Sequence, residues 1–205
     1  MNRIKNYEQA KGVFRALNYT FFDRGFYNLN LFAVRNAKQI PNLFNDVLYV
    51  AYRDEKNTER LEAALCTTVP GVPFLLKPIN PAGAAAIAEG QYRGLWKPGY
   101  FRGRWALLQV GNVRAYRDNN FDGKFDFDAS TITTYGAEAG FFLHETYRGA
   151  MPMYVENSSA GCIVPQQVVF MDTLRRLVGN QFRYLGTDSV TFTLFNSREL
   201  DYIVG

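Results

Sequence analysis

The stretch FFLHETYRGAMPMYVENSSAGCIVPQQ, residues 141–167, contains the only histidine of the 205-residue chain and one of its two cysteines. His144 precedes Cys162 by 18 positions, and a glycine stands directly before the cysteine. A cysteine reacts as its thiolate, and a neighbouring histidine can take the thiol proton and later protonate a leaving amine. Because the chain has no other histidine, any Cys–His chemistry must use His144.

The residues around Cys162 favour it over Cys66 as a nucleophile. Gly161 allows a tight turn, in which backbone N–H groups can face a developing oxyanion. A proline and a helical pattern follow Cys162. We therefore expect the cysteine near a helix N-terminus, where the dipole favours thiolate. Cys66 lies in the strand pattern EAALCTTV and is expected to be a buried apolar thiol. A purely structural role for His144 and Cys162 stays open.

His144, 14 intervening residues and then Ser159-Ala160-Gly161-Cys162-Ile163 resemble the signature of the L,D-transpeptidase (YkuD-type) catalytic domain. In that family a histidine is followed, after a similar interval, by Ser/Thr-His-Gly-Cys. The resemblance, to a divergent phage- or Bacteroidetes-like member, implies a mainly β fold, a β-sandwich or mixed sheet with a helix after the Cys motif. It also implies that Cys162 attacks a peptidoglycan stem peptide at an L-to-D bond, with His144 as the base. Ser159 and Gly161 would shape the turn, and the thioester would pass to an amine or to water.

Two positions depart from the family pattern. Ala160 stands where the family has a histidine, and Val164 stands where it usually has an arginine. The first change removes a supporting hydrogen-bond partner, and the second removes a charge. Tyr147 and Arg148, on the loop after His144, are expected to bind the substrate, and Arg148 is the candidate substitute for the lost groups. The alternative is a non-catalytic structural, virion or wall-binding protein on the same fold.

The rest of the chain has the pattern of a single mainly β domain with few helices. We expect an N-terminal extension over residues 1–40, with a helix capped by Asn6 and then a strand, and a catalytic domain over residues 41–205. The expected helices cover residues 6–17 and 166–178, and the expected strands are 26–34, the hairpin 47–54 and 59–69, 85–96, 104–110, 113–118, 139–144 and 189–196.

A second motif, RDNNFDGKFDFD at residues 117–128, resembles the opening of a calcium-binding loop. Oxygen donors two positions apart can converge on one ion, and a glycine makes the sharp turn. The twelfth position of such a loop normally holds a bidentate acid, but here it is Ala129. A polar turn that bonds its own backbone is therefore the alternative to a calcium site. The candidate ligands are Asp118, Asn120, Asp122 and Asp126.

Charge and hydropathy limit the partners. The net charge of +4 comes from scattered basic residues, and no nucleic-acid-binding motif is present. No apolar run approaches the roughly 18 residues that cross a bilayer, and the N-terminus has no signal-peptide pattern. We expect synthesis in the cytoplasm, no required cofactor, and peptidoglycan stem peptides as partners. The wall would be reached after lysis or as part of a phage particle, a setting that favours hydrolysis over cross-linking.

Overall fold

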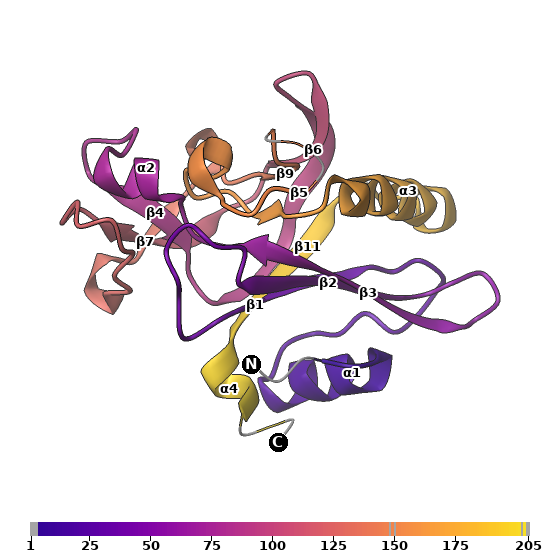
Figure 1. Cartoon of the computed structure of the whole chain (residues 1–205). Helices are drawn as coiled ribbons and strands as arrows, with labels where there is room; N and C mark the ends of the chain where they lie inside the picture. The colour runs from indigo at the N-terminus through magenta and orange to yellow at the C-terminus, as the bar shows by residue number, and fades with distance from the viewer. Residues whose placement is uncertain (1–3, 148, 150, 202, 204–205) are drawn as a thin grey trace.

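The computed structural model describes residues 4–147, 149, 151–201 and 203, and they form two β-sheets and four α-helices (Figure 1). The larger sheet has eight strands in the order β10-β3-β2-β1-β11-β5-β6-β9, and the smaller has the order β4-β7-β8. The strands are β1 Asn30–Arg35, β2 Asp46–Arg53, β3 Glu59–Thr67, β4 Ala84–Ile87, β5 Gly90–Phe101, β6 Arg104–Gln109, β7 Val113–Asp118, β8 Thr133–Tyr135, β9 Leu143–His144, β10 Val164–Pro165 and β11 Val190–Asn196. The helices are α1 Tyr7–Ala16, α2 Val72–Leu76, α3 Val168–Leu185 and α4 Ser197–Asp201.

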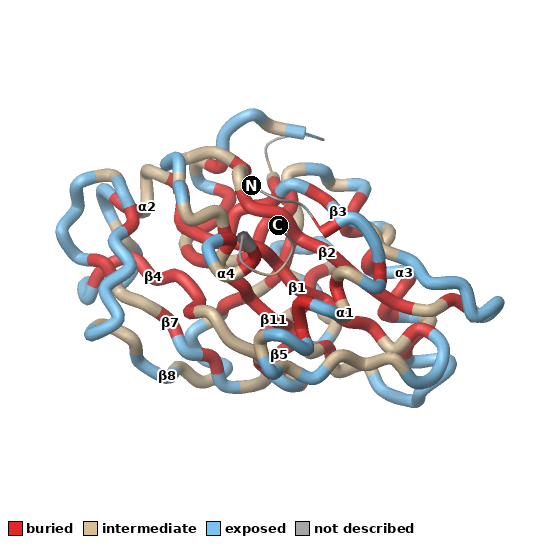
Figure 2. The backbone as a smooth tube through the Cα atoms, turned by 90° about the horizontal axis from the view of Figure 1, so that it is seen from below, coloured by how far each residue is buried: buried red, intermediate tan, exposed pale blue. Residues whose placement is uncertain are grey.

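The large sheet is mixed because its two central strands, β1 and β11, run parallel while its other named pairs are antiparallel. Every residue of β1 is buried, as expected for a strand covered on both faces (Figure 2). The two faces are covered by different helices, α3 on one side and α1 on the other (Figure 1).

The core under α3 is filled by large apolar side chains from both the helix and the sheet. Leu174 and Leu177 of α3 have no exposed surface, and neither do Trp96 and Phe192, whose rings lie 4.6 Å apart. The Trp96 ring nitrogen donates a hydrogen bond to the carbonyl of Phe141 at 2.7 Å, so its single polar atom is satisfied. This bond also fixes the chain just before β9.

The opposite face of the sheet is covered by α1. The helix begins after Asn6, whose side chain accepts a hydrogen bond from the backbone of Gln9. Phe14 is 1% exposed and contacts the rings of Phe32 in β1 and Phe195 in β11 edge to face, at 5.3 and 5.1 Å. Part of the predicted N-terminal extension therefore lies inside the sheet and its core.

The structure confirms the mainly β fold, the N-terminal helix and the helix after the cysteine motif. The expected hairpin corresponds to β2 and β3. Two expected strands differ: the run 85–96 is divided between the two sheets, at the end of β4 and the start of β5. Only Leu143 and His144 of the run 139–144 form a strand, because a 3-10 helix and a left-handed Gly140 precede them.

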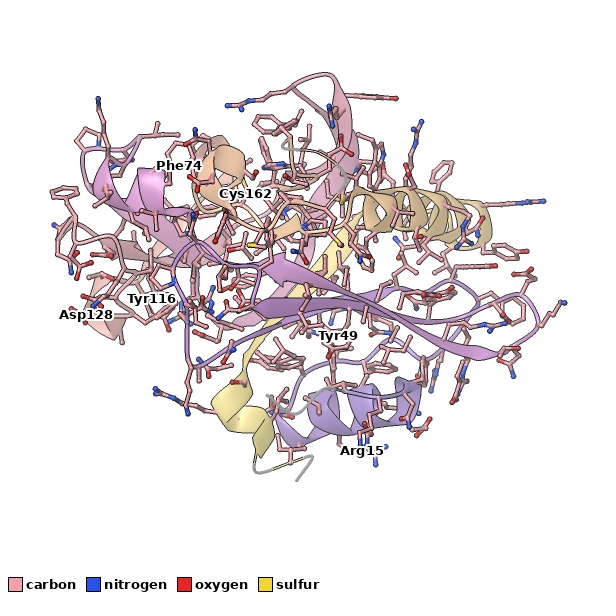
Figure 3. All side chains as sticks on the ribbon, in the orientation of Figure 1. Arg15, Tyr49, Phe74, Tyr116, Asp128 and Cys162 are labelled. Carbon is pink, nitrogen blue, oxygen red and sulfur yellow. The ribbon has the colours of Figure 1, made fainter. Side chains whose placement is uncertain are left out.

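Replacing Phe14 with alanine tests how firmly α1 is joined to the sheet. We expect a loss of about 3–5 kcal/mol in the free energy of unfolding, because the substitution leaves a cavity among three aromatic rings. Urea denaturation of Phe14→Ala measures it. Arg15→Ala is the matched control, since Arg15 is exposed on the helix face that points away from the sheet (Figure 3). An unchanged midpoint in Phe14→Ala would contradict the proposed packing.

Candidate active site

The pairing of β9 with the chain after Cys162 places the cysteine beside the histidine. The N–H of Ile163 donates to the carbonyl of Phe142 at 2.9 Å, and the N–H of His144 donates to the carbonyl of Ile163 at 3.2 Å. Leu143 and Ile163 face each other in this parallel bridge, and both are fully buried. Because side chains alternate along extended chains, His144 and Cys162 share the opposite face. Both line one pocket of about 500 Å³.

His144 is held as a neutral base. Its Nδ1 lies 2.8 Å from the carbonyl oxygen of Glu145, which can only accept, so Nδ1 carries the proton and Nε2 presents a lone pair. His144 is 3% exposed, and its ring contacts both Phe101, at 5.0 Å, and Tyr147, stacked at 5.4 Å. Burial lowers the pKa of His144 to about 4, and the charge of Arg102 adds to this shift.

Cys162 rests as a thiol. Burial raises its pKa to about 11, against the opposing effects of the Phe142 backbone and the Arg102 charge. The thiol donates to the carbonyl oxygen of Gly140 at 3.5 Å. Among the described residues no hydrogen bond joins the sulfur to His144. Direct proton transfer from the sulfur to His144 would therefore require the thiol to leave its contact with Gly140.

Ser159 and Gly161 build the turn that presents Cys162. The buried Ser159 hydroxyl accepts from the N–H of Gly161 at 3.1 Å and donates to the carbonyl of Cys162 at 2.8 Å. Gly161 has φ +132°, and a Cβ there would lie 2.5 Å from the carbonyl oxygen of Ala85. Within the described part of the chain, no hydrogen bond occupies the N–H of Cys162, which is therefore the candidate oxyanion donor.

The structure corrects the position expected for the helix. We expected Cys162 near a helix N-terminus, but β10 intervenes and α3 begins only at Val168, six residues further along the chain. The first turn of α3 therefore does not include the cysteine. Val164, at the position where the pattern of the L,D-transpeptidases usually has an arginine, is fully buried in an apolar cluster with Phe44 and Val155.

The two expected substrate-binding residues have different outcomes. Tyr147 lines the pocket, stacks on His144 and donates its hydroxyl to the carbonyl of Phe101 at 3.4 Å. Arg148 lies outside the described residues. Ala160 also lines the pocket, at the position where the family has its second histidine.

Arginines from distant parts of the chain also line the pocket, and no sequence motif identifies them as site residues. Arg102 lies at the tip of the β5–β6 hairpin, and Arg117 comes from β7. Arg102 has φ +50° and Gly103 has φ +77°, as in the type I′ turn that matches the twist of a two-residue hairpin. The Arg-Gly pair between two strand patterns was the available sequence signal for this turn, but it does not indicate what the turn faces.

The acidic loop after β7 bonds its own backbone. Asp118 accepts from the N–H groups of Asn120 and Asp126, both at 3.2 Å, and Asp122 accepts from that of Lys124 at 2.8 Å. The Asn120 amide donates to Asp126 at 2.7 Å. The described residues contain no group of three or more His, Cys, Asp or Glu arranged for a metal ion. These contacts form a polar turn, and Asp128 at its end lies far from Cys162 (Figure 3). Calcium binding stays a prediction.

Comparison with known proteins gives no relative for this chain: no protein-family model, curated protein or solved structure matches it. None of the helices in the described residues combines the length and apolar character needed to span a membrane. The assignment of the site therefore depends on its own geometry.

Alkylation across pH tests the resting state of Cys162. Because its pKa is raised to about 11, the thiolate fraction and the iodoacetamide rate should rise about tenfold per pH unit from pH 7 to pH 10. Peptide mapping by mass spectrometry reads the two cysteines separately. Cys66 is the internal control, because it is fully buried and should react only after unfolding. An alkylation rate of Cys162 that does not change between pH 7 and pH 10 would instead indicate a thiolate–imidazolium pair.

Gly161→Ala tests the turn itself. Positive φ disfavours alanine, and the added methyl meets the carbonyl of Ala85, so we expect a loss of about 1–3 kcal/mol in the free energy of unfolding. Gly12→Ala is the control, since Gly12 lies in α1 with nothing within 4 Å of an added Cβ. That change should stabilise the protein by about 0.5–1 kcal/mol. Equal effects of the two substitutions in urea denaturation would contradict this account.

Proposed function

We propose that this protein is a cysteine-dependent enzyme of the L,D-transpeptidase type, which acts on peptidoglycan stem peptides through a thioester. One observation carries the proposal: the pairing of β9 with Ile163 brings His144 and Cys162 to the same face of one pocket. The tautomer of His144 supports it, because the lone pair of Nε2 remains for a proton. The spacing of the motif gives the substrate class by resemblance.

The first half of the reaction uses both side chains. Cys162 turns from Gly140, and its proton passes to Nε2 of His144 as the sulfur attacks the stem-peptide carbonyl. The tetrahedral oxyanion accepts a hydrogen bond from the N–H of Cys162. The carbon–nitrogen bond then breaks, and the imidazolium returns its proton to the leaving amine. The product is a thioester and a neutral imidazole.

The second half regenerates the enzyme. Neutral His144 takes a proton from water or from an acceptor amine, which attacks the thioester carbonyl, and the thiol leaves with the proton. The carbonyl of Glu145 holds Nδ1 throughout, so the family's second histidine, replaced by Ala160, is not needed to orient the base. Hydrolysis is the outcome we expect, with the wall reached after lysis or from a phage particle.

The competing function is a non-catalytic wall-binding or virion protein. Its specific support is the resting geometry, in which Cys162 is a protonated thiol that donates to Gly140. In that case the thiol only packs and bonds locally. The two functions differ in whether Cys162 ever forms a covalent bond with a stem peptide.

Purified muropeptides provide the test. Wild-type protein should release an amino acid from the stem peptide, detected by mass spectrometry, and should gain the acyl mass in intact-protein spectra after acid quench. Cys162→Ala should lower the rate at least about a thousandfold, and His144→Asn should lower it about 10²–10⁴-fold.

Cys66→Ala is the matched control and should retain activity, because Cys66 does not line the pocket. Circular dichroism should show that each variant is folded. Muropeptides that are unchanged by wild-type protein, with no acyl mass on Cys162, would rule out the enzyme and favour the binding protein.

A further inference from the structure

The pocket beside Cys162 carries a net positive charge. Among the described residues its charged lining consists of Arg102, Arg117 and the carboxylate of Glu138, while the imidazole of His144 is neutral near pH 7. Glu138 accepts a hydrogen bond from the N–H of Gly136 at 3.2 Å. A pocket with an excess of positive charge attracts anionic ligands.

The two arginines differ in how far their hydrogen-bond donors are used. Arg117 donates to the carbonyl of Gly83 at 2.7 Å and to the hydroxyl of Tyr135 at 2.9 Å. Arg102 forms no hydrogen bond or ion pair with any described residue. Its guanidinium instead lies over two rings, 5.2 Å from the centre of Phe101 and 5.7 Å from that of Tyr147. Contact with ring faces holds the cation while its in-plane N–H groups stay available for a carboxylate.

The hairpin places this arginine next to the catalytic pair. Phe101, which precedes Arg102, contacts the ring of His144 at 5.0 Å, and Tyr147, whose ring lies 6.4 Å from that of Phe101, stacks on the same histidine ring at 5.4 Å. The next strand, β6, pairs directly with β9. The charge of Arg102 lowers the pKa of both Cys162 and His144, as expected for a cation facing both groups. No such effect of Arg117 on either group is resolved.

We propose that Arg102 receives the carboxylate of the acyl donor, so that the site selects donors with a free carboxylate close to the reacting carbonyl. The identity of this donor as a stem peptide rests on the proposed function. A leaving D-amino acid would carry such a carboxylate. Arg102 would thus supply, from the hairpin tip, a positive charge that Val164 does not provide. The predicted role of Arg102 is to select the acyl donor, and it takes no part in bond making or proton transfer.

The test compares two alkylating reagents that differ only in charge. Iodoacetate carries a carboxylate on the reacting carbon, and iodoacetamide is its neutral counterpart. The thiolate of Cys162 attacks the CH2 carbon of either reagent and displaces iodide, so the ratio of the two rates cancels changes in the pKa of the thiol. We expect the ratio in the folded protein to exceed that in guanidinium-unfolded protein by about three- to fivefold, since water screens exposed charges. Salt at about 0.5 M should reduce this preference, because it screens the charge of the arginine.

Variants assign the preference to one residue. Arg102→Gln should bring the ratio down to that of the unfolded protein, and Arg102→Lys should keep part of it. Lys97→Gln removes one positive charge from β5 of the same hairpin and should leave the ratio unchanged, because Lys97 pairs with Asp188 at 3.2 Å and does not line the pocket. Arg117→Gln should have a smaller effect than Arg102→Gln.

Three results would overturn the proposal: a ratio that Arg102→Gln does not change, a ratio that only Arg117→Gln changes, or a Cys162 that neither reagent modifies in the folded protein. The reagents do not require a stem peptide. An Arg102-dependent ratio together with unchanged muropeptides would therefore reject the proposed function and keep the anion site. Turnover of muropeptides together with a ratio that does not depend on Arg102 would support the proposed function and reject the anion site.

Discussion

Two backbone hydrogen bonds hold Cys162 beside His144, and the rest of the candidate site is arranged around this pair. One runs from the N–H of Ile163 to Phe142, and the other from the N–H of His144 to Ile163. They join the turn after Gly161 to β9, which itself pairs with β6. Because side chains alternate with a period of two, a slip of one residue would turn Cys162 into the core and Ile163 out of it. The full burial of Leu143 and Ile163 fixes the register that places the two reactive groups on one face.

Burial has opposite effects on the two reactive groups. It raises the pKa of Cys162 and lowers that of His144, so both are neutral at rest. The resting site therefore differs from one that holds a preformed thiolate–imidazolium pair. In the proposed reaction, the same exclusion of water would strengthen a hydrogen bond from the N–H of Cys162 to a developing oxyanion. Arg102, exposed at its hairpin tip, acts on the pair through its charge.

Local patterns predicted most elements but not their partners. The cap at Asn6 and the spacing of Ala10, Val13 and Phe14 identified α1, and alternation identified β11. The run 85–96 was expected to be one strand, yet its two parts belong to different sheets. The change comes near Gly90, whose φ of +153° favours glycine and which no apolar pattern reveals. The position of Cys162 relative to α3 was also wrong, because the two-residue strand β10 is too short to show a period.

The sequence by itself determined the chemical inventory: a single histidine, a cysteine preceded by a glycine, and a serine two positions before that glycine. Only the tertiary structure decided what surrounds them. Arg102 reaches the site because β6 pairs with β9, about 40 residues further along the chain. The parallel pairing of β1 with β11 likewise places residues before 40 at the centre of the sheet. Such pairings depend on hydrogen bonds and burial between distant segments, and a local pattern of residues does not encode them.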